Sequence, residues 1–510
     1  MTPDAHVPHL PTPDAPTSAA PVTLETLMQR ALTVVSGLAP EVLELGEIFA
    51  AAGHELALVG GPVRDAFLGR ASADLDFTTS ATPDQTLALL AAWGDAHWDI
   101  GKEFGTIGAK RFAHRGRGTD EVVVEVTTYR ADEYDPSSRK PVVTFGSTLE
   151  GDLSRRDFTV NAMALRLPQL ELVDPHDGLA DLAAGVLRTP IAPELSFDDD
   201  PLRMMRAARF AAQLGFTIEP ATRQAIVDMA GRMSIVSAER VRAELDKLLL
   251  SATPRPGLEV LTDTGLAQHV LPELPLMKEA VDEHGRHKDV YQHTLTVLAQ
   301  AMDLETGPDG PVPGPDLVLR LAALLHDCGK PATRRFEPGG GVSFHHHELV
   351  GAKLARKRLK ELRYDKDTVK DVSRLVELHL RFHGYGDGGW TDSAVRRYVT
   401  DAGPLLERLH RLTRADCTTR NRRRAQRLSE AYDSLEARIA DLAEREEIAA
   451  IRPDLDGGQI MAILGITPGP VVGEAYKFLL ERRMENGPVD EETATAELLA
   501  WWADRQSAQA

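Results

Sequence analysis

Cysteine, long apolar runs and excess positive charge are all scarce in this sequence. Only Cys328 and Cys417 occur, which argues against a framework of several disulfides and favours a reducing, cytoplasmic compartment. No apolar run reaches the roughly 18 residues of a membrane-spanning helix, so we expect no membrane span. The 58 Lys and Arg are outnumbered by 77 Asp and Glu, giving a net charge of −19. Any contact with a polyanion must therefore use local basic segments.

The chain of 510 residues is long enough for roughly three or four domains. Residues 1–22 are rich in Pro, Ala and Thr without the pattern of a targeting signal, and we expect a disordered tail there. Apolar periodicity predicts helices at 23–52 and 83–96, and alternation predicts strands at 105–112 and 121–130. The polar segment 131–153 contains proline and serine and is predicted to be a mobile loop.

The stretch LVGGPVRDAFLGRASADLDFTT (58–79) carries the densest chemical signal. Asp74 and Asp76 are two residues apart on a predicted strand, so their side chains share one face. Paired carboxylates suit a hard cation such as Mg²⁺ that is shared with substrate phosphates. Gly60 and Gly61 let the backbone approach a phosphate chain, and Arg64 can bind it in bidentate fashion. Together these residues predict a phosphoryl-transfer site with bound metal ions.

Two later segments extend this prediction. In the strand 121–130, Glu125 is a candidate third carboxylate, although a solvated strand acid explains it equally well. In RRDFTVNAMAL (155–165), two arginines beside an acid suit the binding of a triphosphate.

The segment DDDPLRMMRAARFAAQLGF (198–216) predicts a helix that Asp200 caps and Gly215 ends. Cytosine and adenine both present an amino donor beside a ring-nitrogen acceptor. A carboxylate and a guanidinium, here Asp200 and Arg203, can read that pair, whereas uracil and guanine present the reverse pattern. On the helix alone, a capping Asp200 and arginines in surface pairs are the simpler interpretation. The arginines recur at every third position: Arg203, Arg206 and Arg209.

A second constellation lies in the helical second half of the chain. Imidazole and carboxylate side chains spread over several predicted helices suit a divalent-metal site that activates water. The candidates are His293, His326, Asp327, His347, His379 and Asp416. Basic segments at 353–366 and 408–427 are either solvated helix faces or contacts for a phosphate backbone. At 455–487, two predicted helices are joined by a Gly/Pro turn.

The motif GGPVRDAFLG…DLD resembles motif A of the class II tRNA nucleotidyltransferases, which are the CCA-adding enzymes and bacterial poly(A) polymerases of the polymerase-beta-like superfamily. RRDFTVNA resembles motif B of this family, and DDDPLR resembles its EDxxR motif with Asp199 in place of the usual Glu. The resemblance implies that Arg156 contacts the triphosphate and that Asp200 and Arg203 select the base. It makes Arg206 and Arg209 candidates for triphosphate or primer contacts. A loop at 131–153 implies a complete CCA-adding enzyme.

The second half of the chain resembles the HD phosphohydrolase superfamily. That resemblance places His293, His326, Asp327 and Asp416 at the four core ligand positions of one possible divalent metal. The C-terminal helices resemble the family's tRNA-binding tail. We therefore predict an α/β head followed by all-α parts, with these boundaries: tail 1–22, nucleotidyltransferase head 23–190, helical neck 191–255, HD-type domain 256–430 and helical tail 431–510.

The predicted function is template-independent addition of CCA to the 3′ end of tRNA from CTP and ATP, with Mg²⁺ on Asp74 and Asp76. One alternative is a poly(A) polymerase on the same scaffold. Another is a metal-dependent HD phosphohydrolase whose head only binds. A third is a protein-uridylylating regulatory enzyme, against which the pair Asp200 and Arg203 argues because it disfavours UTP.

Overall fold

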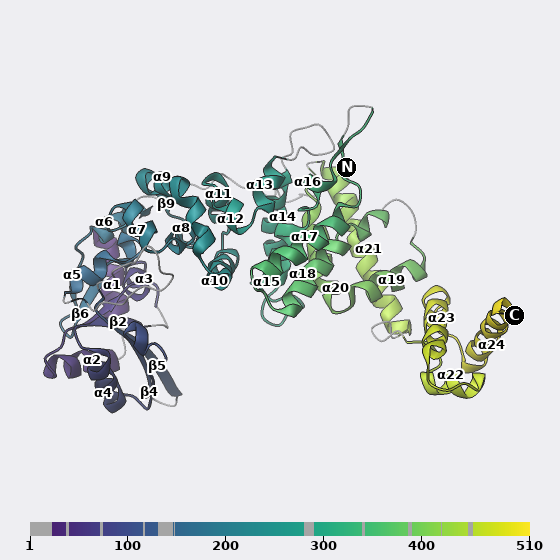
Figure 1. Cartoon of the computed structure of the whole chain (residues 1–510), viewed down its shortest axis with the longest axis horizontal. Helices are drawn as coiled ribbons and strands as arrows, with labels where there is room; N and C mark the ends of the chain where they lie inside the picture. Colours follow the sequence, from purple (N-terminus) through teal and green to yellow (C-terminus); the bar gives the residue numbers. More distant parts are fainter. Residues whose placement is uncertain are drawn as a thin grey trace, which may run out of the picture. The chain divides into compact units, whose positions relative to one another are not determined.

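The computed structural model describes residues 23–36, 40–71, 75–115, 118–130, 146, 148–279, 290–338, 342–385, 390–419, 421–446 and 452–509. The predicted tail 1–22, Asp74 and residues 131–145 of the predicted loop lie outside the described residues. The chain divides into two units, one made of residues 1–237 and 252–269 and the other of residues 238–251 and 270–510 (Figure 1). None of the described helices is both long enough and apolar enough to cross a membrane.

A mixed sheet of seven strands forms the centre of the first unit, in the order β3-β4-β5-β2-β1-β6-β7. β2 pairs with β5 in parallel, and the other neighbours pair in antiparallel fashion. The strands are β1 (Leu56–Val59), β2 (Leu75–Thr79), β3 (Ala96–Trp98), β4 (Thr106–Arg115), β5 (Gly118–Thr128), β6 (Ala164–Leu167) and β7 (Glu171–Val173).

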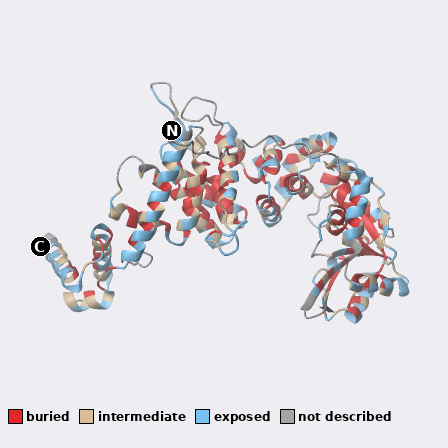
Figure 2. Ribbon diagram, turned by 180° about the vertical axis from the view of Figure 1, so that it is seen from behind, coloured by how far each residue is buried: buried red, intermediate tan, exposed pale blue. Residues whose placement is uncertain are grey.

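Burial along the strands follows their place in the sheet. All four residues of β1 are buried, because β2 and β6 flank it and helices cover the sheet. On β5, Val122, Val124 and Val126 are buried while Glu125 is exposed, as expected of a strand with one covered face. Figure 2 shows the buried residues of this unit concentrated in the strands and in the helices beside them.

Helices surround this sheet, and α4 contacts β3, β4 and β5. Thr82 and Gln85 form a reciprocal capping box at the start of α4. The helices of the first unit are α1 (Leu24–Ser36), α2 (Pro40–Ala51), α3 (Gly61–Phe67), α4 (Pro83–Trp93), α5 (Leu149–Ser154), α6 (Gly178–Ala184), α7 (Pro193–Asp199), α8 (Leu202–Leu214), α9 (Pro220–Met229) and α11 (Arg255–Asp263), with 3-10 turns η1 (Lys102–Phe104), η2 (Thr159–Asn161) and η3 (Ala230–Ile235) and a small sheet of β8 (Val186–Leu187) and β9 (Thr217–Ile218).

The predicted end of the loop 131–153 is wrong, because residues from Leu149 onward form helix α5. The Thr148 side chain accepts a hydrogen bond from Gly151 N at 3.2 Å and caps the helix. Leu149 and Leu153, one helical turn apart, are buried in the core beneath the sheet. The polar composition of the segment concealed this pair.

The second unit is almost entirely helical, which agrees with the predicted fold class of an α/β head and all-α parts. Its centre is built from α14, α15, α17, α18 and α20, which contact one another. The elements are α10 (Ala238–Leu249), α13 (Glu273–Lys278), α14 (Val290–Asp303), α15 (Leu317–Leu325), α16 (Lys330–Thr333), α17 (His347–Glu361), α18 (Lys366–Leu378), α19 (Asp392–Ala402), α20 (Leu406–Asp416), α21 (Arg422–Glu446), α22 (Gly457–Leu464), α23 (Pro470–Asn486), α24 (Glu491–Gln509), η4 (Arg381–Gly384), η5 (Gly403–Leu405) and a hairpin of β10 (Arg335–Phe336) and β11 (Val342–Ser343); α12 (Ala267–Val270) lies at the boundary between the units.

Candidate functional sites

Two carboxylates lie side by side on the exposed face of the first unit's sheet. Asp76 on β2 and Glu125 on β5 are register partners in the parallel pair, and both residues are exposed. Because side chains alternate along a strand, they share the face opposite buried Phe77 and Val124. Asp74, two residues before Asp76 in the sequence, lies outside the described residues.

The glycine pair is a tight turn between β1 and α3 that two arginines flank. Gly60 has a φ of 72°, a conformation that favours glycine, and a Cβ there would lie 3.1 Å from Arg156 Nη1. Arg64 is buried in the first turns of α3, where its Nη1 donates to Asn161 Oδ1 at 2.7 Å and its Nε to Asp65 Oδ1 at 2.9 Å. Two guanidinium groups are therefore fixed beside a backbone that can approach a phosphate closely.

The carboxylate of Asp157 links this turn to helix α8. It accepts hydrogen bonds from Asn161 Nδ2 at 2.9 Å and from Arg206 Nε at 2.7 Å. Burial by itself would raise the pKa of Asp157, but the Arg206 charge and these hydrogen bonds lower that pKa to about 2. Asn161 in turn holds Arg64. A continuous polar network therefore runs from α8 to the glycine turn.

On α8, the arginines at every third position have different surroundings. Arg203 donates through Nη1 to Ser196 Oγ at 2.8 Å and through Nη2 to the carbonyl of Arg155. Arg209 is buried, bonds Gln213 and lies 4.0 Å from the Phe210 ring centroid. The predicted buried face of the helix is confirmed, since Leu202, Met205, Ala208 and Phe210 are all buried, and Gly215 ends the helix in the left-handed conformation.

The predicted cap at the start of α8 is present in a slightly different form. The helix begins at Leu202, with Pro201 before it, and Asp200 Oδ1 accepts a hydrogen bond from Leu202 N at 3.1 Å. This contact fixes the Asp200 carboxylate at the beginning of the helix that carries Arg203.

In the second unit, the four predicted metal ligands come together at helix ends. His293 lies in the first turn of α14, His326 and Asp327 directly follow α15, and Asp416 is the last residue of α20. His293 Nε2 lies 2.9 Å from Asp416 Oδ1, and His326 Nε2 lies 3.2 Å from Asp327 Oδ2.

His347 and His379 join the same cluster. His347 begins α17, and its Nε2 lies 3.2 Å from Asp327 Oδ1. His379 directly follows α18, and its Nε2 lies 3.9 Å from the same oxygen. Close packing makes this possible, because a Cβ at Gly329 would lie only 2.1 Å from the His347 carbonyl oxygen. The ligand atoms form two groups, each with all its atoms within 4.8 Å of one another: His293, His326 and Asp416; and Asp327, His347 and His379.

Electrostatics keep the carboxylates of this cluster ionised. Burial favours a neutral Asp327, but His326 and Lys330 hold its pKa well below the ordinary value. Burial also favours a neutral Asp416, but contacts with His293 and His326 hold the pKa of Asp416 well below the ordinary value. Although burial opposes it, Asp327 and Asp416 raise the pKa of His326 to about 10, whereas burial lowers the pKa of His379 to about 3. Carboxylate oxygens and imidazole nitrogens are the donors that divalent transition metals prefer.

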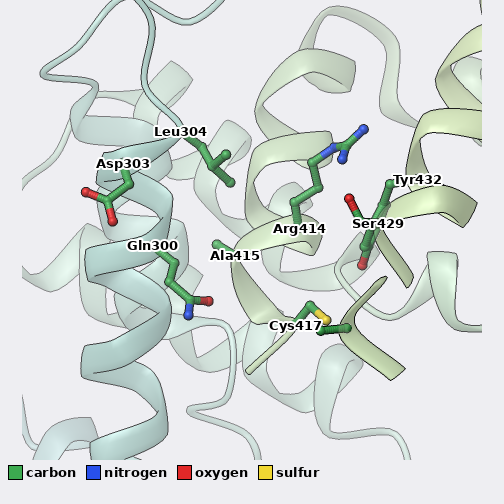
Figure 3. Close-up of a pocket in the computed structure, with 9 residues that line it drawn as sticks. Gln300, Asp303, Leu304, Arg414, Ala415, Cys417, Ser429 and Tyr432 are labelled. Atoms are coloured by element: carbon green, nitrogen blue, oxygen red, sulfur yellow. The ribbon is translucent and has the colours of Figure 1, made fainter. Parts of the chain in front are cut away.

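A pocket with a cavity volume of about 370 Å³ adjoins this cluster, between α14, α20 and α21 (Figure 3). Ala415 and Cys417, which flank the ligand Asp416, both line it. Arg414 in its wall pairs with Asp433 at 2.7 Å and lies over the ring of Tyr432. Burial raises the pKa of Cys417, so its thiol stays protonated at neutral pH.

Comparison with known proteins identifies the family to which this chain belongs. Residues 56–188 match the family described as "Poly A polymerase head domain", residues 215–277 match "Probable RNA and SrmB- binding site of polymerase A", and residues 290–448 match "HD domain". The sequence is 38% identical over 437 residues to the "A-adding tRNA nucleotidyltransferase" of Deinococcus radiodurans, covering 84% of this chain and 91% of that protein. The chain belongs to the tRNA nucleotidyltransferase family. The predicted family and its attached HD domain are thereby confirmed.

Other tRNA nucleotidyltransferases share the similarity over most of their length. The "CC-adding tRNA nucleotidyltransferase" of Thermus thermophilus is 33% identical over 456 residues, covering 88% of this chain and 94% of that protein. The "CCA-adding enzyme" of Streptococcus suis is 30% identical over 455 residues, covering 88% of this chain and 93% of that protein. Among solved structures, the CCA-adding enzyme of Bacillus stearothermophilus matches with a TM-score of 0.63 and 24% identity, covering 92% of this chain and 100% of that chain. This last likeness confirms the fold.

Several contacts of this tRNA nucleotidyltransferase were not predicted. Ser196 holds Arg203, and the ring of Phe210 lies beneath Arg64 and Arg206 as well as Arg209, at 5.2 Å and 5.5 Å for the first two. Neither residue carries a sequence signal beyond its ordinary helix position. His347 and His379 did carry one, because both belong to the imidazole and carboxylate constellation of the second half, but the HD resemblance does not place them at its four core ligand positions.

Proposed function

We propose that this protein adds CCA to the 3′ end of tRNA from CTP and ATP without a nucleic-acid template. The observation that carries the proposal is the pairing of Asp76 with Glu125 on the exposed face of the sheet, in a chain of the tRNA nucleotidyltransferase family. The proposal includes the predicted division into head, neck, HD-type domain and tail, and a cytoplasmic location, where tRNA, CTP and ATP are found together.

In the proposed reaction, the 3′-hydroxyl oxygen of tRNA forms a bond to the α-phosphorus of CTP or ATP. The bond from that phosphorus to the bridging oxygen breaks, pyrophosphate leaves, and the hydroxyl proton passes to solvent. Asp74, Asp76 and Glu125 would hold Mg²⁺, which when bound neutralises phosphate charge and makes the hydroxyl more acidic. The two register partners fit this task, because oxygen ligands on one face are what Mg²⁺ requires.

The chain's own residues would position the triphosphate. The Gly60-Gly61 turn brings backbone close to the phosphates, with Arg64 and Arg156 on either side. Arg156 Nε is buried and has no hydrogen-bond partner among the described residues, and a phosphate oxygen would satisfy it. Arg206 would act indirectly, because its contact with Asp157 supports Asn161 and through it Arg64.

Asp200 and Arg203 would select the base. Three described contacts hold the Arg203 guanidinium, and a guanidinium has five N–H groups, so donors remain for a ring nitrogen. The Asp200 carboxylate would accept from the amino group of cytosine or adenine. Arg203→Lys should therefore raise KM for CTP and ATP and weaken discrimination against UTP, because a lysine lacks the rigid fork. If Arg203→Lys discriminates against UTP as well as the wild type does in a nucleotide-competition assay, Arg203 does not select the base.

The names of the relatives differ in which nucleotides are added, so the decisive experiment is product sequencing. Three tRNA substrates are needed: one that ends before CCA, one that ends in C and one that ends in CC. CTP and ATP are supplied separately and together. CCA on the shortest substrate supports the proposal. Addition of A only to the substrate ending in CC, addition that stops at CC, or a tract of A would each identify a different enzyme.

A second candidate function is hydrolysis of phosphate esters by the HD unit. The observation that favours it is the cluster of buried imidazoles and carboxylates beside a pocket. The pocket would hold the organic part of the ester. Asp76→Ala separates the two functions, because it should abolish nucleotide addition and leave metal-dependent hydrolysis unchanged. Loss of both activities would contradict two independent sites.

A further inference from the structure

We propose that Trp98 is a stacking platform for the 3′-terminal base of the RNA that is being extended. By holding that base, it brings the terminal 3′-hydroxyl to Asp76 and Glu125. None of the motifs that predicted the chemistry of the head includes Trp98. This role rests on the proposed nucleotide addition and adds a contact for the acceptor RNA to it.

Trp98 belongs to a row of four residues that crosses the sheet. Asp76 on β2 pairs with Glu125 on β5. Glu125 also pairs with Gly108 on β4, which pairs in turn with Trp98 on β3. Directly opposite residues of neighbouring strands have their side chains on the same face, and neighbouring strands lie about 4.8 Å apart. Trp98 therefore shares the face of the two carboxylates, with a single strand between its own strand and that of Glu125.

The indole of Trp98 covers the glycine that separates it from Glu125. A Cβ on Gly108 would overlap the indole atoms Cε2, Nε1 and Cζ2, so the ring lies across β4 on the face from which such a Cβ would project. Gly108 is buried, whereas Glu125 beside it is exposed and Trp98 itself is partly exposed. The ring thereby extends from the edge strand β3 toward the carboxylate pair.

The order of the strands separates the two substrates across the carboxylates. β1, which leads into the Gly60-Gly61 turn, lies on one side of the β2–β5 pair, and β4 and β3 lie on the other. In nucleotidyl transfer, the attacking oxygen and the leaving pyrophosphate are roughly in line on opposite sides of the phosphorus. With the triphosphate at the glycine turn, the 3′-hydroxyl approaches from the side of β5. The base on the same ribose would then lie over β4 and β3, where the indole of Trp98 is.

The same face carries other groups that are typical of sites for single-stranded nucleic acid. Lys110 and Phe112 follow Gly108 at alternate positions of β4, and Lys110 Nζ lies 5.2 Å from the centroid of the Phe112 ring. Phe112 is 42% exposed. Aromatic rings beside cationic side chains bind single strands by stacking and charge, with little dependence on sequence. That tolerance suits a chain end whose terminal base changes as nucleotides are added.

The test is a double-mutant cycle between Trp98 and the terminal base, with the full-length chain and a tRNA that the wild type extends. One form of this tRNA carries its terminal base, and the other is abasic at that nucleotide but keeps the 3′-hydroxyl. Trp98→Leu keeps an apolar side chain near Gly108 but cannot stack, whereas Trp98→Phe can. We expect Trp98→Leu to raise KM for the intact tRNA by roughly 5- to 150-fold, which corresponds to the loss of one base–aromatic stack. KM for the nucleoside triphosphate should not change, removal of the base should have no further effect, and Trp98→Phe should retain most of the affinity for tRNA.

The matched control is His97→Leu, which alters the exposed neighbour of Trp98 on the opposite face of β3 and should leave both KM values unchanged. If Trp98 only covers Gly108, removal of the base will have equal effects in the wild type and in Trp98→Leu. That result would overturn the proposed stacking, as would an unchanged KM for tRNA or an equal rise in both KM values.

A second measurement decides if Trp98→Leu does not fold, as judged by circular dichroism. In a chain whose other four tryptophans are replaced by phenylalanine, the intact tRNA should quench Trp98 fluorescence more than the abasic tRNA does. Equal quenching would overturn the proposed stacking. A wild type that extends no tRNA would refute the proposed function and the role of Trp98 with it, whereas the other contrary outcomes leave the proposed function intact.

Discussion

Asp157→Asn removes a charged acceptor of Arg206 at the contact between α8 and the segment after α5. Neighbouring Asn161 also loses its carboxylate partner. The pKa of Asp157 is lowered from 3.8 to about 2. At 1.36 kcal/mol per pKa unit, this difference corresponds to about 2 kcal/mol of stability at neutral pH.

The sign follows from the lowered pKa. The ionised form is favoured in the folded state, so the contribution is fully present above pH 3.8 and is lost as the pH falls through about 2. The difference in unfolding free energy between the wild type and Asp157→Asn should therefore be about 1 kcal/mol smaller at pH 3 than at pH 6.

The assay is urea unfolding followed by tryptophan fluorescence. Of the five tryptophans, Trp93 and Trp98 lie in the first unit, so replacing the others by phenylalanine makes that unit the reporter. The control Asp84→Asn alters a largely exposed surface pair with Lys102 and should match the wild type. An Asp157→Asn variant as stable as the wild type at pH 6, or a difference that is constant down to pH 3, would refute the reasoning.

Two further predictions concern the two sites. Asp76→Asn should lower kcat for CTP incorporation by on the order of 10²–10³-fold. Glu125→Gln should also lower kcat, whereas the control Glu121→Gln on the same strand should not. Equal rates for Glu125→Gln and Glu121→Gln would show that Glu125 is a solvated strand acid. Gly329→Ala should lower the unfolding free energy of the HD unit by about 1–3 kcal/mol, and with it the unfolding temperature, because the added Cβ would meet the His347 carbonyl oxygen. The same clash should displace His347 and weaken Mn²⁺ binding. Gly473→Ala, in α23 with open space around it, is the matched control; identical melting curves and Mn²⁺ affinities for the two alanine variants would contradict the close-packing argument.

Much of the head could be predicted because its signals are local. Alternating valines indicated β5, and the capping residues and Gly215 marked helix α8. The role of Glu125 could not be decided from sequence, because it depends on strand order. β5 pairs with β2 although β3 and β4 lie between them in the sequence, and the register of that pair places Glu125 beside Asp76.

The parts that could not be predicted depend on contacts between distant segments. Contact of Arg206 with the triphosphate or primer stays a prediction, and its pairing with Asp157, a residue from a separate motif, had no local signal. The second pair of histidines was visible as single residues. Which Asp327 oxygen each one faces depends on the packing of α17 against Gly329, and no local pattern encodes that packing.

The central claim is that the head reads C and A through protein groups and joins them to tRNA. The most direct measurement is sequencing of the 3′ ends formed on a tRNA that lacks CCA, with CTP and ATP supplied together. The account predicts CCA as the product, no extension with ATP alone, and CC with CTP alone. Extension by ATP alone on this substrate, or incorporation of UTP as readily as CTP, would contradict it.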